Sequence, residues 1–240
     1  AQQIRIAPSP PRPKADPGEA GFSAGRLAEL TAGLEARGTT SLLVIRQGKT
    51  VVEWYAHGWD RNRKHYSASL AKSLVGGLSL MLALDDRAIV LDAPACRYIP
   101  EWRLDGRKAM ITIRQLATHT SGLEDAEMTP EEIRELVSGG LQIRDAHLDL
   151  PGWKGRFWRR DPDPFTVSRD LCPVLTTPGT KFAYSNPGMA MLSYAVTSAL
   201  AQNGCRTDLR SLLRSRIMEP LGIGDEEWSI GYNQTYSVEG

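Results

Sequence analysis

The sequence lacks a charge excess and a long apolar run. Its 29 basic side chains face 28 acidic ones, which leaves a formal net charge of +1 at pH 7. Domains that bind nucleic acid carry a clear basic excess, so this balance argues against a nucleic-acid partner. The longest uncharged apolar run, residues 73–84, is 12 residues long, whereas a spanning helix needs about 18 or more. We therefore expect no membrane span.

Cysteine and histidine are both scarce. The 3 cysteines, Cys96, Cys172 and Cys205, fit no zinc-ligand spacing and allow at most one disulfide plus a free thiol. We expect them to be small buried hydrophobic residues. The 4 histidines form no HExxH or HxH pair: His57, His65, His119 and His147. The sequence therefore predicts no metal site and no cofactor.

What remains is an ordinary globular composition after a proline-rich start. Apolar residues make up 41% of the 240 positions and charged residues 24%, which suits one large domain or two small ones. Residues 1–21 contain five prolines, and we expect them to form a stiff N-terminal tether. The first residue is Ala1 rather than Met. A small residue at that point is typical of signal-peptide cleavage, so we expect an exported protein, periplasmic, extracellular or otherwise secreted.

From residue 22 onward the sequence alternates helical and β-type patterns. Ser23 precedes a predicted helix that ends near Gly38. The β-rich runs 41–46 and 50–55 flank a turn that contains glycine and predict an antiparallel hairpin. Further helices are predicted at 70–84, 111–116, 190–200 and 209–218. Helices outnumber strands and the strands form a hairpin, so the fold class is α+β.

The first chemical motif is Ser69 followed three residues later by Lys72. Residues three apart on a helix share a face, so the lysine can reach the serine hydroxyl. Serine is a weak nucleophile until a base removes its proton, and lysine can serve as that base in its uncharged form, which burial favours. Alone the motif is weak, because chance gives about 0.5 such spacings in a chain of this composition.

The second motif is Tyr184-Ser185-Asn186. A tyrosine beside a lysine can shuttle protons, and an asparagine amide can hold a substrate carbonyl or amide. The alternative is a core tyrosine and an asparagine in a turn, since Asn186 is followed by Pro187 and Gly188.

Five blocks in a fixed order decide between these alternatives. They are residues 66–74 (YSASLAKSL), 91–94 (LDAP), 113–123 (IRQLATHTSGL), 178–186 (PGTKFAYSN) and 218–223 (MEPLGI). Over residues 22–223 the sequence resembles the class C β-lactamase and penicillin-binding-protein-like serine hydrolases, a family that also holds D,D-peptidases and serine esterases. The resemblance implies an antiparallel sheet flanked by helices plus a helical region, in one domain spanning residues 22–240.

The resemblance also implies roles for individual residues. Ser69 would be the acylated nucleophile, and Lys72 and Tyr184 would share its deprotonation and the later protonation of the leaving group. Asn186 would line the site and contact the substrate or Lys72. The backbone N–H of Ser69 would supply one oxyanion donor. His119 lies in a block that is mostly structural in such proteins, and we leave it off the predicted site.

Two features depart from the family pattern. The family's third motif, KTG or HxG, is missing, because no lysine or histidine follows Asn186. The resemblance thus implies that the chain lacks the C-terminal strands, and that a second chain or a C-terminal segment completes the sheet. The other departure is an insertion at about 124–177, which carries aromatic and cationic side chains at 153–160 (WKGRFWRR). It is interpreted either as a lid suited to a substrate carboxylate or as an excursion that packs its own core.

The functional prediction is a serine hydrolase that forms a covalent acyl-enzyme on small esters or amides, of the β-lactamase-related esterase type. Its partner is then a small-molecule ester, amide or β-lactam substrate. The alternatives are a β-lactamase or D-alanyl-D-alanine carboxypeptidase, and a non-catalytic binding protein on the same fold. An α/β-hydrolase is disfavoured, because the GxSxG match at residues 21–25 (GFSAG) follows the proline-rich start rather than the strand that a nucleophile elbow requires.

Overall fold

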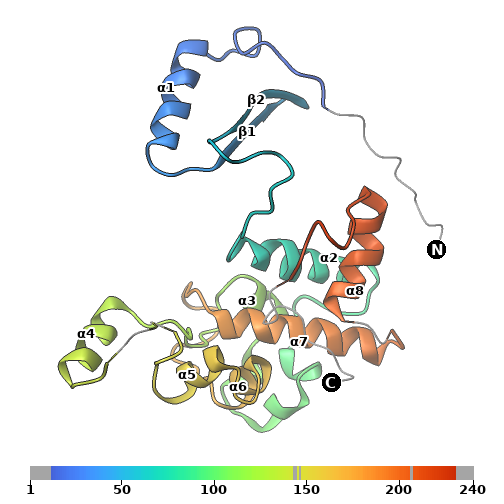
Figure 1. The fold of residues 1–240 in the computed structure, drawn as a ribbon. Helices are drawn as coiled ribbons and strands as arrows, with labels where there is room; N and C mark the ends of the chain where they lie inside the picture. The colour runs from blue at the N-terminus through green and yellow to red at the C-terminus, as the bar shows by residue number, and fades with distance from the viewer. Residues whose placement is uncertain (1–11, 143–144, 146, 206–207, 231–240) are drawn as a thin grey trace. The chain divides into compact units, whose positions relative to one another are not determined.

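The computed structural model describes residues 12–142, 145, 147–205 and 208–230, which divide into two compact units (Figure 1). The first unit comprises residues 12–66 and 220–228, and the second comprises the rest of the described chain. The single domain predicted for residues 22–240 stays a prediction.

The first unit is built around a β-hairpin. Strands β1 (Ser41–Arg46) and β2 (Lys49–Tyr55) pair antiparallel, with Ser41 opposite Tyr55 and a register shift between Val44 and Ile45. Gln47 and Gly48 form the turn with φ values of 50° and 74°. Two successive left-handed residues are typical of a type I′ turn, whose twist matches that of the strands. The predicted hairpin is confirmed.

Helix α1 (Ala24–Glu35) precedes the hairpin in this unit. The side chain of Ser23 accepts a hydrogen bond from the backbone N–H of Arg26, which satisfies one of the free donors at the helix start. Gly38 has a φ of 76°, a conformation that glycine adopts without strain beyond a helix end. Both signals were visible in the sequence, and the predicted helix is confirmed.

Part of the predicted proline-rich tether contacts the hairpin. Lys14 forms a parallel bridge with Thr50. The carbonyl of Pro13 accepts from the backbone N–H of Thr50, and the N–H of Ala15 donates to the carbonyl of Thr50, each at 2.9 Å. Residues 1–11 of the tether lie outside the described residues.

The second unit is helical. Its regular elements are a π-helical stretch (Lys72–Gly77), α2 (Leu78–Asp85), 3-10 turns (Ala95–Arg97, Pro100–Leu104, Lys108–Met110), α3 (Ile113–Ala117), α4 (Pro130–Ser138), α5 (Gly152–Arg159), α6 (Pro164–Asp170), α7 (Asn186–Gln202), α8 (Leu209–Leu213) and a second π-helical stretch (Arg214–Met218). A 3-10 turn at Glu219–Leu221 follows.

Helix α7 is the centre of this unit. Figure 1 shows it running between α2 and α3 on one side and α6 on the other, and it packs against all three. It begins at Asn186, directly after the Tyr184-Ser185 pair, and most of its residues are buried. The large side chains of the core are Tyr98, Ile99, Trp102, Ile111, Ile113, Leu116, Met191 and Leu192. A buried central helix fixes its own N-terminus, so the start of α7 is a rigid place for functional side chains.

The helix predicted at 70–84 differs in one respect. Its first half is π-helical and only its second half is α-helical. Two glycines, Gly76 and Gly77, end the π-helical stretch. Glycine lowers helix stability by roughly 1 kcal/mol relative to alanine, so a departure from α geometry is easiest at this pair. π-Helical turns are often found at functional sites.

The cysteines behave differently from one another. All three are free thiols, and only Cys172 is fully buried, while Cys96 is half-buried and Cys205 is exposed. The expectation of three buried hydrophobic residues is therefore wrong for Cys205. In the described part of the chain, no helix combines the length and the apolar character that crossing a membrane requires.

Candidate active site

Ser69 and Lys72 stand where an irregular segment becomes helical. Lys72 is the first residue of the π-helical stretch, and its Nζ lies 3.0 Å from Ser69 Oγ as a hydrogen-bond donor. The lysine is only 8% exposed. Ala68, just before the serine, has a φ of 46°. A left-handed alanine costs about 1–2 kcal/mol, so the chain holds a strained turn directly beside Ser69.

Tyr184 reaches the same serine from a distant segment. Its hydroxyl donates to Ser69 Oγ at 2.7 Å, across 115 residues of sequence. Lys72 Nζ lies 4.8 Å from the centre of the Tyr184 ring, within the range of a cation–π contact. Ser69 Oγ is thus hydrogen-bonded to two groups that can exchange protons with it. The structure brings together the three residues predicted to do the chemistry.

His119 lies against Tyr184, although the sequence analysis left it off the site. The two rings stack with their centres 4.8 Å apart and 25° between their planes. His119 Nδ1 accepts a hydrogen bond from the backbone N–H of Ser185 at 3.2 Å. His119 therefore touches both Tyr184 and its neighbour, and it supports the Tyr184 side chain. Its place in the block at 113–123 was the one available signal.

Burial and charge keep this histidine neutral. Burial lowers the pKa of His119, the nearby charge of Lys72 lowers it further, and Asp125 acts in the opposite direction. A neutral ring is also what the hydrogen bond demands, since Nδ1 can accept only when it carries no proton. The backbone of His119 has a φ of 55°. This conformation is uncommon for a residue other than glycine, although histidine tolerates it better than most.

Asn186 is buried at the start of α7. Ser185 is extended, with φ −150° and ψ 114°, so the side chains of Tyr184 and Asn186 leave the chain on the same side. Asn186 is 3% exposed. Its backbone N–H and its side-chain Nδ2 both donate to Asp125 Oδ1, at 2.8 Å and 2.9 Å. These bonds use the nitrogen of the amide, and contact with substrate or Lys72 through the oxygen stays a prediction.

Cationic side chains of the insertion contact other groups of the protein. Lys154 contacts Glu124 and Glu132, at 2.9 Å and 3.5 Å. Arg159 donates to the carbonyls of Leu148 and Leu150. Phe157, Leu150, Phe165 and Val167 are buried. Of the two interpretations of the insertion, these contacts favour the one in which it packs its own core.

Among the described residues, no group of three His, Cys, Asp or Glu side chains is placed so that it could hold a metal ion. Lys72 contacts the predicted nucleophile, and the carboxylates of Asp125 and Glu127 contact Asn186. Glu127 Oε1 lies 3.4 Å from Asn186 Nδ2. The arrangement is therefore one of hydrogen-bonded proton donors and acceptors around a serine, which suits nucleophilic catalysis.

Comparison with known proteins finds relatives in sequence and in structure. The family model described as Beta-lactamase matches residues 27–234. Esterase EstB from Burkholderia gladioli is 28% identical over 166 residues, covering 66% of this chain and 36% of the esterase. The 6-aminohexanoate-dimer hydrolase from Paenarthrobacter ureafaciens is 25% identical over 177 residues, covering 72% of this chain and 41% of the hydrolase. The chain thus spans less than half the length of these relatives.

The fold is shared with solved structures. A class C β-lactamase in complex with cefoxitin superposes with a TM-score of 0.52 at 19% identity, over 78% of this chain and 46% of that enzyme. At this level of identity the likeness concerns the fold. It confirms the predicted architecture of a β-lactamase-like α+β protein, of which the described residues contain one hairpin and the helical region.

Proposed function

Because the chain belongs to the β-lactamase family, we propose that it is a serine hydrolase that acts on small esters or amides through a covalent acyl-enzyme. One observation carries the proposal: Lys72 Nζ and Tyr184 Oη both lie within hydrogen-bond distance of Ser69 Oγ, at 3.0 Å and 2.7 Å. A serine with two proton-transfer partners is what nucleophilic attack at neutral pH requires.

The proposed acylation begins at Ser69. Uncharged Lys72 takes the hydroxyl proton while Oγ forms a bond to the substrate's carbonyl carbon. The bond from that carbon to the leaving oxygen or nitrogen then breaks, and the leaving group takes the phenolic proton of Tyr184. Tyr184 recovers a proton from Lys72, which lies against its ring. The backbone N–H of Ser69 is proposed as one donor to the developing oxyanion.

Deacylation reverses these roles with water as the nucleophile. Uncharged Lys72 accepts the proton of the attacking water, whose oxygen bonds to the acyl carbon. The bond from that carbon to Ser69 Oγ breaks, Oγ takes the phenolic proton of Tyr184, and Tyr184 recovers a proton from Lys72. The same two groups serve both halves of the reaction, because both are hydrogen-bonded to the one oxygen that first attacks and then leaves.

The preference for esters or amides draws on the relatives. The two curated ones are an esterase and a 6-aminohexanoate-dimer hydrolase. Neither name refers to a β-lactam, which favours ordinary esters or amides as substrates here. We expect faster turnover of p-nitrophenyl butyrate than of a chromogenic cephalosporin, and an initial burst of p-nitrophenol if the acyl-enzyme accumulates.

The test is a measurement of intact mass before and after treatment with a fluorophosphonate, made on the protein as the cell produces it. We expect one adduct in the wild type and none in Ser69→Ala. Ser73→Ala is the matched control, because Ser73 is an exposed serine in the same segment, and it should be labelled like the wild type. An unlabelled wild type would overturn the proposal in favour of a binding protein on this fold. A labelled Ser69→Ala would overturn it because the probe would then react with another residue.

A further inference from the structure

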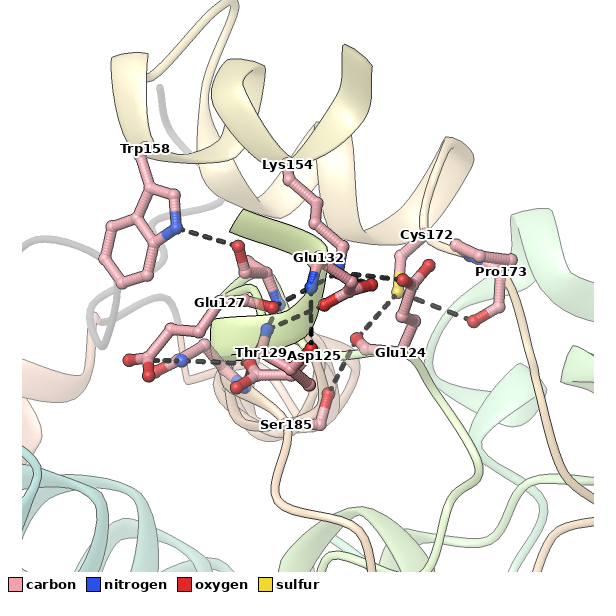
Figure 2. Close-up of polar contacts among 12 residues, drawn as sticks. Glu124, Asp125, Glu127, Thr129, Glu132, Lys154, Trp158, Cys172, Pro173 and Ser185 are labelled. Atoms are coloured by element: carbon pink, nitrogen blue, oxygen red, sulfur yellow. Dashed lines mark hydrogen bonds and ion pairs between the residues drawn. The ribbon is translucent and has the colours of Figure 1, made fainter. Parts of the chain in front are cut away.

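In the loop at residues 124–127, here called the Asp125 loop, three of the four backbone carbonyls accept hydrogen bonds from side chains. Figure 2 shows the contacts. The carbonyl of Glu124 accepts from Ser185 Oγ at 3.2 Å and from Cys172 Sγ at 3.4 Å. Two further carbonyls of the loop accept from side chains of α5: that of Ala126 from Trp158 Nε1 at 3.0 Å, and that of Glu127 from Lys154 Nζ at 3.1 Å. A loop fixed in this way places its own side chains accurately.

Lys154 is the central anchor of this loop. Its side chain projects from α5 toward the loop, and Lys154 is only 9% exposed. Besides the carbonyl of Glu127, its ammonium contacts the carboxylates of Glu124 and Glu132. Glu132 in turn closes a capping box with Thr129 at the start of α4. One cation of the insertion therefore joins α5, the Asp125 loop and the start of α4.

The Asp125 side chain points from this loop to the start of α7. A single oxygen, Oδ1, accepts three hydrogen bonds, from the backbone N–H groups of Ala126 and Asn186 and from Asn186 Nδ2, at 2.8, 2.8 and 2.9 Å. Two of the three donors belong to Asn186. Asp125 therefore grips both the main chain and the side chain of a residue predicted to line the active site.

The chemistry of a carboxylate decides which end of the amide it holds. The side-chain amide of asparagine has one donor end and one acceptor end, and its last torsion is soft. An ionised carboxylate can only accept hydrogen bonds. The NH₂ end of Asn186 must therefore face Asp125, and the carbonyl oxygen Oδ1 must point away from it.

We infer that Asp125 is a positioning residue, which fixes the Asn186 amide so that its oxygen is presented as an acceptor in the active site, and that Lys154 holds the loop that carries it. The effect on turnover rests on the proposed function. The insertion, on this inference, works as the rigid backing of Asn186. It acts on the reaction through Asn186 and makes no contact with the reacting atoms.

The first test is a double-mutant cycle on kcat/KM for p-nitrophenyl butyrate. We expect Asp125→Ala to lower kcat/KM about tenfold in the wild-type background and less than about twofold in the Asn186→Ala background, because a residue that acts through Asn186 has nothing to position once it is gone. Asp125→Asn, which keeps an acceptor oxygen, should stay within about threefold of wild type. Equal losses in both backgrounds, or no loss in the wild type, would contradict the inference.

Two further variants protect this test from trivial outcomes. Glu131→Gln is the control for lost charge, since Glu131 lies on α4 and pairs with Arg134 at the surface; kcat/KM should not change. If Asp125→Ala fails to fold, Lys154→Met takes its place in the same cycle. Methionine fills a similar volume, and loosening the loop should lower kcat/KM by about threefold only while Asn186 is present.

A second readout does not depend on activity. The side-chain NH₂ of Asn186 gives its own pair of NMR signals, and its hydrogen exchange should be slow in the wild type and clearly faster in Asp125→Ala or Lys154→Met. Unchanged exchange would overturn the inference even in an active enzyme. If exchange is faster in these variants but the fluorophosphonate never labels the wild type, Asp125 does position Asn186 and only the proposed function fails.

Discussion

The two halves of the active site are built in different ways. Ser69 and Lys72 lie one helical turn apart, and the hydrogen bond between them spans three residues of sequence. Tyr184 and Asn186 are placed by residues far away in the chain: Ser185 bonds to His119 across 66 residues, and Asn186 bonds to Asp125 across 61. The first half is a local structure, and the second half depends on the tertiary fold.

This difference predicts two kinds of sensitivity. A local pair keeps its geometry as long as its own helix forms, so substitutions there should remove chemistry and spare the fold. A half that is assembled from distant segments should respond to changes in its supports, with graded losses of both activity and stability.

Lys72→Met should give the largest loss. It removes the proposed base and leaves a side chain of similar length, so acylation by p-nitrophenyl butyrate should slow by at least about a hundredfold, the usual scale for loss of a general base. Circular dichroism should show an unchanged fold. Lys181→Met, at an exposed lysine, is the control and should act like the wild type. A loss below tenfold would mean that Tyr184 or water removes the proton.

Tyr184→Phe should have a smaller effect, of about ten- to a hundredfold on kcat. The change deletes the hydroxyl that donates to Ser69 Oγ and keeps the ring that stacks on His119. The fluorophosphonate should still label Ser69, because Lys72 remains in place. Tyr66→Phe removes the hydroxyl of an exposed tyrosine and serves as the control. If kcat does not fall in Tyr184→Phe, the proton goes to the leaving group by another route.

The sequence predicted the local half well. The spacing of Ser69 and Lys72 is a weak motif alone, but it predicts that the two side chains meet, and the hairpin and the N-cap at Ser23 follow from turn and capping chemistry, because each of these features is decided within a few residues. The order of the five blocks then added Tyr184. The described structure places its hydroxyl on Ser69, as a shared site requires.

The supports of the other half left no comparable pattern. His119 stacks on Tyr184, and Asp125 grips Asn186, yet nothing in the spacing of these residues announces contacts over 60 positions. The same holds for Lys154, one of the insertion's cations, for which the sequence left both a lid and a packed excursion open; it is buried against Glu124. Partners of this kind are chosen by tertiary packing, and a single sequence does not record which carboxylate a buried lysine will meet.

The smallest predicted effect is the pH dependence that His119 adds to stability. Burial, with help from Lys72, places the pKa of folded His119 below its usual value of about 6.5. When the pH falls below about 6.5, the unfolded chain takes up a proton before the folded one does, so the free energy of unfolding drops until the folded pKa is reached. Above about 6.5 this contribution is fully present. Each tenfold change in proton affinity corresponds to about 1.4 kcal/mol.

His119→Asn isolates this contribution. Asparagine tolerates the left-handed backbone at this position, offers an oxygen to the Ser185 N–H, and does not titrate. Urea unfolding of both proteins between about pH 5 and pH 8 should therefore show a stability difference that shrinks as the pH falls, with the variant losing less than the wild type. Parallel curves would mean that His119 has the same proton affinity folded and unfolded. His119 would then support Tyr184 through packing alone, and its titration would not distinguish the distant half of the site from the local half.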